Sequence, residues 1–198
     1  MEKQKIDKHP FKPFLHQGCK VVMCGTFPPK SEKWAMEFFY PNFQNDMWRI
    51  FGLLYFADKE HFYNRATKTI NKTAIEAMLT RLKVGVGETA TEVIRTRDNA
   101  SDKFLEIVTS VNLPALLAQV PECRIVATTG EKAASVIADL TSTPLPKMGQ
   151  HVECGVTMPD GALRRFLHWR LPSTSRAYPM KLEAKAAYYA QMLKFVMP

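Results

Sequence analysis

Two short loops, each containing Pro and each directly after a strand-like run, constrain the fold of this chain most strongly. The first loop, Gly25-Thr26-Phe27-Pro28-Pro29, follows the apolar run at residues 21–24. The second loop, Leu171-Pro172-Ser173-Thr174-Ser175, follows the run at residues 166–170. A parallel sheet gathers the carboxyl ends of its strands at one edge, where ligands usually bind. The sequence therefore predicts that these two loops, from opposite ends of the chain, meet at one cleft.

The pattern between the loops alternates strand-like with helix-like segments, which is typical of a parallel sheet built from βαβ units. Ser31 is placed as the N-cap of a short helix over residues 32–36. We expect an α/β fold, a three-layer α/β/α arrangement with a mainly parallel central sheet, in one domain over residues 1–198 with an N-terminal arm at 1–18. Further helices are expected at 45–55, 71–82, 131–140 and 180–196, strands at 84–87 and 124–128, and a loop with a hairpin or edge strand at 141–161.

The composition favours a polyanionic partner and a reducing compartment. The formal net charge is +8 over 198 residues, and a basic surface attracts the phosphates of nucleic acid. The alternative is a basic surface that serves only solubility. The four cysteines show no CxxC pair and no zinc-ligand spacing, so we expect free thiols and a cytoplasmic location. The charged N-terminus has no signal-peptide pattern, and no apolar run is long enough to span a membrane.

Several common catalytic signatures are missing from the sequence. It has no GxxxxGK[ST] or GxGxxG nucleotide motif, no GxSxG nucleophile motif and no HExxH zinc motif. What remains is residues 38–49, where aromatic and amide side chains stand directly before a helical pattern. Aromatic rings can stack on an extruded nucleobase and amides can pair with its polar edge. Alternatively, the aromatic residues form the core and Asn45 caps the helix.

These residues together resemble the uracil-DNA glycosylase superfamily, most closely its hypoxanthine-type and mismatch-specific branches. The first motif of that superfamily is a strand followed by Gly-x-x-Pro, an aromatic residue and, in these branches, Asn-x-Phe-Trp. The loop from Gly25, then Tyr40, then Asn45-Asp46-Met47-Trp48 follow in this order. The second motif is a strand that ends in a Pro-Ser loop, matched by Pro172-Ser173. The resemblance extends over about residues 21–193 and covers nearly the whole chain.

The resemblance implies a monofunctional DNA glycosylase of base-excision repair. Such an enzyme flips a deaminated or damaged base, hypoxanthine or uracil, and hydrolyses its N-glycosidic bond, which needs donors at the departing base and a positioned water. Asn45 would be the catalytic residue. The implied partner is DNA containing such a base, with a monomeric protein and no metal or cofactor. The base-binding residues would be Thr26, Phe27, Tyr40 and Glu88, and the DNA-binding residues Ser31, Ser173, Thr174, Ser175 and Arg176.

Two positions depart from the superfamily pattern. Phe27 stands where the uracil-specific and mismatch-specific branches carry Asp or Asn, and Leu171 stands where the uracil-specific branch carries a histidine. The hypoxanthine-type branch is also apolar at the first position and relies on the Asn that corresponds to Asn45. This departure favours the hypoxanthine-type reading over vigorous uracil removal in the style of the uracil-specific branch.

Other residues with polar or charged side chains have two interpretations each. Glu88 either faces the cleft from the end of a strand or begins a helix, and His168 is expected to be a packed, hydrogen-bonded residue. Arg95, Arg97 and Lys103 form either a phosphate-facing patch or a solvated surface. At the level of function, the alternatives to the glycosylase are a non-catalytic nucleic-acid or nucleotide-binding member of the same fold, and a small-molecule hydrolase on this scaffold.

Overall fold

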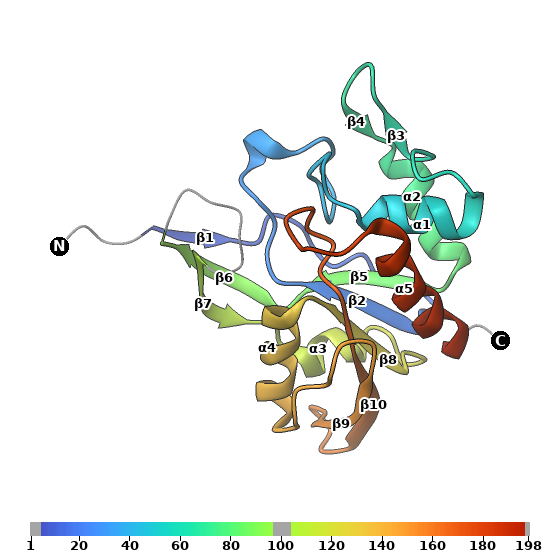
Figure 1. Ribbon diagram of the computed structural model, residues 1–198. Coiled ribbons are helices and arrows are strands. Elements are labelled where there is room, and N and C mark those ends of the chain that lie inside the picture. Colours follow the sequence, from blue (N-terminus) through green and yellow to red (C-terminus); the bar gives the residue numbers. More distant parts are fainter. Residues whose placement is uncertain (1–4, 97–103, 197–198) are drawn as a thin grey trace.

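The computed structural model describes residues 5–96 and 104–196, and its largest element is a five-stranded sheet (Figure 1). Four strands run parallel, and the fifth pairs antiparallel with its neighbour at one edge. The expected mixed α/β fold with a mainly parallel sheet is therefore confirmed. In sheet order the strands are β5 (Val84–Glu88), β2 (Val21–Gly25), β8 (Ile125–Thr129), β10 (Leu163–Leu171) and β9 (His151–Thr157).

Side chains on the two faces of this sheet belong to two separate hydrophobic clusters. In β2, Val21 and Met23 join one cluster, whereas Val22 and Cys24 join the other, as the two-residue period of a strand requires. The first cluster includes α1 (Met47–Phe56), α2 (Lys72–Arg81) and α5 (Leu182–Val196), and the second includes α3 (Leu113–Ala118) and α4 (Glu131–Thr141). None of the helices in the described part of the chain is long and apolar enough to cross a membrane.

Local sequence signals explain where the helices begin. Asn71 caps α2, because its side chain accepts a hydrogen bond from the Ala74 N–H at 3.1 Å. Asn112 caps α3 in the same way, through the Ala115 N–H. The helix expected from residue 45 begins two residues later, at Met47, so Asn45 lies just outside it.

The helix expected at residues 32–36 is wrong. The chain forms only a 3₁₀ turn (Ser31–Lys33), and the backbone of Trp34 is extended, with φ −86° and ψ 135°. Tertiary contacts of Trp34 override the local signal: its indole N–H donates to the Pro29 carbonyl at 2.7 Å, and its backbone forms a β-bridge with Asn42. Ser31 therefore caps no α-helix.

A second sheet was not anticipated, and part of the N-terminal arm belongs to it. Its antiparallel strands, in order, are β1 (Ile6–Lys8), β6 (Ala90–Arg95) and β7 (Leu105–Ser110). A small hairpin of β3 (Tyr63–Asn64) and β4 (Thr69–Ile70) follows α1. The expected edge strand within residues 141–161 is present as β9, and β10 begins three residues earlier than the run at 166–170 indicated.

The register of the parallel strands brings four chain segments to one edge of the sheet. Gly25 at the end of β2 pairs with Glu88 at the end of β5, and Leu171 at the end of β10 pairs with Thr129 at the end of β8. The segments that leave these four residues therefore begin side by side, and they form the walls of the cleft described next.

Candidate active site

A cleft of about 870 Å³ lies at the carboxyl edge of the parallel sheet and is lined by both Pro-containing loops. The predicted meeting of these loops is confirmed, since Pro28 and Ser173 line the same cleft. Ser31 is the one predicted site residue that does not line it; it is exposed on the 3₁₀ turn. The other nine line the cleft: Thr26, Phe27, Tyr40, Asn45, Glu88, Ser173, Thr174, Ser175 and Arg176.

Tyr40 lies across the end of β2, close to Gly25. Its hydroxyl is hydrogen-bonded to Thr129 Oγ1 at 3.0 Å, and its backbone φ is +51°, in the left-handed region that a large residue rarely adopts. A Cβ on Gly25 would come within 3.2 Å of the Tyr40 hydroxyl, so the glycine makes room for this ring. The tertiary structure thus holds Tyr40 in a strained position beside the first loop.

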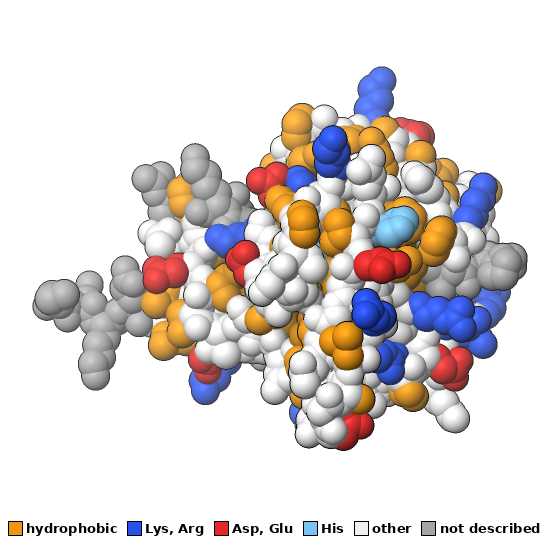
Figure 2. Space-filling model, turned by 90° about the horizontal axis from the view of Figure 1, so that it is seen from below, with side chains coloured by type: hydrophobic (Ala, Val, Ile, Leu, Met, Phe, Trp, Pro, Cys, Tyr) orange, Lys and Arg blue, Asp and Glu red, His pale blue; other side chains and the backbone are white. Residues whose placement is uncertain are grey.

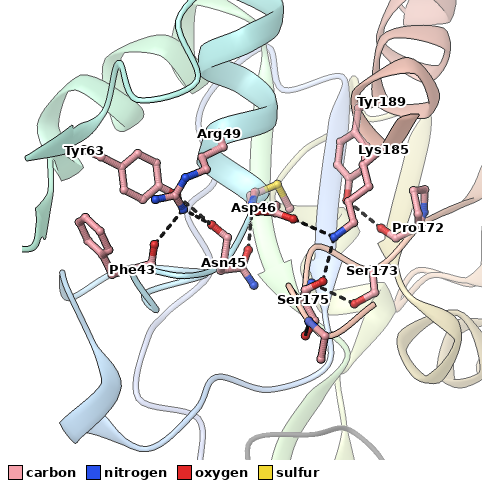
Figure 3. Close-up of polar contacts among 12 residues, drawn as sticks. Phe43, Asn45, Asp46, Arg49, Tyr63, Pro172, Ser173, Ser175, Lys185 and Tyr189 are labelled. Atoms are coloured by element: carbon pink, nitrogen blue, oxygen red, sulfur yellow. Dashed lines mark hydrogen bonds and ion pairs between the residues drawn. The ribbon is translucent and has the colours of Figure 1, made fainter. Parts of the chain in front are cut away.

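The amide of Asn45 is oriented by the first turn of α1. Its Oδ1 accepts a hydrogen bond from the Met47 N–H at 2.9 Å, so the amino group points away from the helix (Figure 3). The backbone carbonyl of Asn45 is fixed as well: it accepts from Arg49 Nη1 at 3.1 Å and from the Tyr63 hydroxyl at 3.0 Å. Asn45 therefore offers the cleft an amide group of defined orientation.

Arg49 supports this arrangement from inside the protein. Only 4% exposed, it also donates to the Phe43 carbonyl at 2.8 Å and to Glu60 Oε1 at 3.1 Å, and its guanidinium lies 3.8 Å from the centre of the Tyr63 ring. Burial alone would raise the pKa of Glu60. The guanidinium groups of Arg65 and Arg49 outweigh this effect and hold the pKa of Glu60 below its ordinary value. Sequence analysis missed Arg49, because nothing in the pattern of α1 distinguishes it from a surface arginine.

The second loop is anchored by α5 and by the residue before α1. Lys185 Nζ donates to the Ser175 carbonyl at 2.8 Å, and the Tyr189 hydroxyl donates to the Pro172 carbonyl at 3.1 Å (Figure 3). The Asp46 N–H donates to the Thr174 carbonyl at 2.9 Å. Lys185 and Tyr189 also escaped prediction, because their positions on α5 look like ordinary positions of an amphipathic helix.

The structure separates Thr174 from Ser175 and Arg176, which we predicted together as DNA-binding residues. Thr174 is only 3% exposed, so its side chain does not protrude from the loop as a DNA contact requires. Ser175 and Arg176 are exposed at the mouth of the cleft. The loop turns sharply there, because the Ser175 N–H donates back to Ser173 Oγ at 3.2 Å.

Phe27 and Arg95 connect the first loop to the second sheet. The ring of Phe27 packs against the small core of that sheet, and Arg95 lies 5.4 Å from the ring centre while donating to the Pro28 carbonyl at 2.7 Å. Arg95 is also paired with Asp7 at 2.8 Å and its side chain is 8% exposed, so the phosphate-facing interpretation of Arg95 is wrong. Arg97 and Lys103 lie outside the described residues.

Glu88 ends β5 and lines the cleft, which excludes the interpretation that it begins a helix. Burial raises the pKa of Glu88 above its ordinary value, although the neighbouring His9 opposes this shift. His9 was not predicted as a site residue, because it lies in a segment that reads as an arm. His168, in contrast, is packed as expected: it is fully buried, and its Nε2 lies 2.9 Å from Thr128 Oγ1.

Charged side chains of both signs lie on the face of the molecule seen in Figure 2. Lys and Arg side chains are there among acidic and hydrophobic ones. At the cleft itself the lining includes Lys132 and Arg176, with Glu131 beside them.

The chain was compared with known proteins at the levels of family, sequence and structure. No family model matches it, and no curated protein matches its sequence. Among solved structures it is similar to the solution NMR structure of a protein from Methanosarcina acetivorans titled a "putative Uracil DNA glycosylase". The TM-score is 0.61 at 18% sequence identity, over 96% of this chain and 99% of the other. At this identity the likeness establishes a shared fold, which extends over nearly the whole length of both chains.

Proposed function

We propose that the protein is a monofunctional DNA glycosylase that extrudes a deaminated base, hypoxanthine or uracil, and hydrolyses its N-glycosidic bond. The observation that carries the proposal is the convergence of Tyr40, the oriented amide of Asn45 and both Pro-containing loops on one cleft of about 870 Å³. Pockets of this size accommodate small ligands such as a nucleoside. The shared fold with the Methanosarcina protein also supports this function. The two hydrophobic clusters on opposite faces of the sheet support a three-layer arrangement, with helices on both sides.

The chemistry assigns a distinct task to each group in the cleft. The departing base gains negative charge as the sugar becomes oxocarbenium-like, so a donor at the base lowers the barrier. Asn45 Nδ2 is suited to that task, because Oδ1 is already bonded to the Met47 N–H. Oδ1 retains a second lone pair that can orient the attacking water. Tyr40 stacks on the extruded base, and Glu88 and the backbone around Thr26 and Phe27 contact its polar edge.

We place the DNA contacts on the second loop at the mouth of the cleft and on the exposed 3₁₀ turn that carries Ser31. Ser173 and Ser31 bind phosphates that flank the extruded nucleotide. Ser175 and Arg176 occupy the emptied position in the duplex, and Arg176 supplies positive charge there. No cofactor or metal is needed for hydrolysis by these groups, and one protein molecule suffices for each damaged base.

A panel of duplexes with single lesions tests the proposal. Each end-labelled duplex carries one uracil or one hypoxanthine opposite each normal base, and alkali cleaves the strand wherever a base has been released. We expect strand cleavage that requires the lesion, with hypoxanthine favoured because Phe27 provides no carboxamide in the first loop. An absence of cleavage with every duplex, together with tight lesion-dependent binding, would instead establish the non-catalytic DNA-binding alternative, which the same Phe27 favours.

A further inference from the structure

His9 and Glu88 form a pair at the inner wall of the cleft. His9 Nε2 lies 2.9 Å from Glu88 Oε2, and the side chains are only 5% and 6% exposed. His9 directly follows β1 and Glu88 ends β5, so the pair joins the second sheet to the parallel sheet. Both residues line the cleft.

The imidazole of His9 is held in place by aromatic rings. It stacks on Phe39 with 5.7 Å between ring centres and meets Phe27 edge-on at 5.2 Å. Its other nitrogen, Nδ1, lies 2.9 Å from the carbonyl oxygen and 3.2 Å from the amide nitrogen of Phe11. Because one atom of Phe11 accepts and the other donates, the site accommodates a neutral or a protonated imidazole.

The two oxygens of Glu88 have different surroundings. Oε2 is fully buried beside His9, where the contact is electrostatic and lacks the alignment of a good hydrogen bond. Oε1 has no hydrogen-bond partner among the described residues, and it is therefore the oxygen available to a ligand in the cleft. Of the titratable groups, His9 contacts this carboxyl, and the Cys24 thiol of β2 is near enough for an electrostatic interaction with it. Burial raises the pKa of Cys24 well above its ordinary value, so the thiol stays neutral.

We propose that His9 is a positioning residue that keeps Glu88 ionised, and that Glu88 Oε1 thereby selects bases whose ring presents an N–H group. This inference rests on the proposed function and specifies how its substrate is chosen. Deamination converts a ring nitrogen that accepts hydrogen bonds, as in adenine or cytosine, into an N–H donor, as in hypoxanthine or uracil. An ionised carboxylate attracts that N–H and repels the lone pair of the parent base, whereas a protonated carboxyl distinguishes the two poorly.

Equilibrium binding separates this inference from catalysis. The probes are duplexes with a single 2′-fluoro-2′-deoxyinosine or 2′-fluoro-2′-deoxyadenosine, in which fluorine disfavours the oxocarbenium-like state and so blocks cleavage. We expect the wild type to prefer the inosine duplex and to lose this preference as falling pH protonates Glu88. In His9→Leu the loss should occur about one or more pH units higher, because an adjacent opposite charge typically shifts a carboxyl pKa by that amount. Glu88→Gln offers both a donor and an acceptor, as a protonated carboxyl does, so it should show little preference at any pH.

The exposed His151, which lies on β9 and does not line the cleft, provides the matched control: His151→Leu should behave as the wild type. A pH dependence in His9→Leu identical to that of the wild type would overturn the proposal, as would equal weakening at every pH, which indicates a merely structural role. A wild type that binds both duplexes equally at every pH would also overturn it. A wild type that prefers inosine in this assay but releases no base from natural lesions would disprove the glycosylase while leaving the selection by Glu88 intact.

Discussion

Lys185 Nζ lies 2.8 Å from Asp46 Oδ2, and the two residues come from opposite ends of the chain. Both are buried: Lys185 is 0% and Asp46 is 7% exposed. Asp46 directly precedes α1 and follows Asn45, whereas Lys185 lies in α5 and also holds the carbonyl of Ser175. This ion pair therefore fixes two elements of the cleft, the Asn45 segment and the second loop, relative to each other (Figure 3).

Replacing Lys185 by Met should destabilise the protein strongly. The substitution leaves the buried Asp46 carboxylate without its cation, which typically costs about 3–5 kcal/mol of unfolding free energy. Urea unfolding measures this loss. Lys72→Met is the matched control, because Lys72 forms an exposed pair with Glu76 at 3.8 Å and should cost less than about 1 kcal/mol. A Lys185→Met protein as stable as the control would show that the ion pair does not stabilise the cleft.

Arg49→Lys should impair base release more than DNA binding. A lysine cannot reproduce the planar donors that reach the carbonyls of Phe43 and Asn45, so the Asn45 amide should shift. A displacement of about 1 Å can cost roughly 10²-fold in rate. Single-turnover base release and duplex affinity measure the two effects. Arg65→Lys serves as control, since Arg65 contacts the same Glu60 but its side chain is 73% exposed; equal effects of both substitutions would contradict the positioning role of Arg49.

Arg176→Ala should weaken binding to every DNA sequence and reduce its salt dependence. Arg176 is exposed at the mouth of the cleft, and each neutralised phosphate contributes about −0.9 to the slope of log K against log salt concentration. We therefore expect the slope to become less steep by about one. Fluorescence anisotropy over a salt series gives this value. Binding that is independent of salt in the wild type would point to a small-molecule substrate.

His168 should make the protein less stable in mild acid. Burial lowers the pKa of His168 from its ordinary 6.5 to about 4, so the unfolded chain binds a proton between these pH values that the folded protein does not. The unfolding free energy should therefore fall as the pH drops from 6.5 to 4, by up to about 3 kcal/mol from this residue. His168→Gln should show a flatter profile in that window, and the exposed His151→Gln an unchanged one. Parallel profiles for the wild type and His168→Gln would disprove the assignment.

The parallel sheet was predictable because its strands carry strong local signals. Residues 21–24 and 124–128 are apolar runs bounded by turns, and the Pro-containing loops mark where two strands end. The convergence of these loops then follows from the geometry of parallel strands rather than from any single residue. Asn71 is a comparable case, where the capping residue identifies the start of α2 within one position.

The remaining features depend on contacts between distant residues. The helix expected after Ser31 fails because the indole of Trp34 bonds to Pro29 and its backbone pairs with Asn42. His9 reaches the cleft through the pairing of β1 with β6, and Lys185 reaches the second loop through the packing of α5 against α1. Neither residue has a sequence neighbour that signals its partner. The second sheet was missed because its strands are half-exposed and mixed in polarity, so they carry no clear local strand signal.

The most direct test of the account is single-turnover release of hypoxanthine by the wild type and by Asn45→Ala. We expect the wild type to release the base and the variant to be slower by about 10²–10⁴-fold, the usual contribution of a positioned catalytic group. Binding to the 2′-fluoro-2′-deoxyinosine duplex should change little. Unfolding must be followed in parallel, because loss of the bond to the Met47 N–H can itself cost about 1 kcal/mol. A folded Asn45→Ala protein that releases hypoxanthine at the wild-type rate would contradict the account.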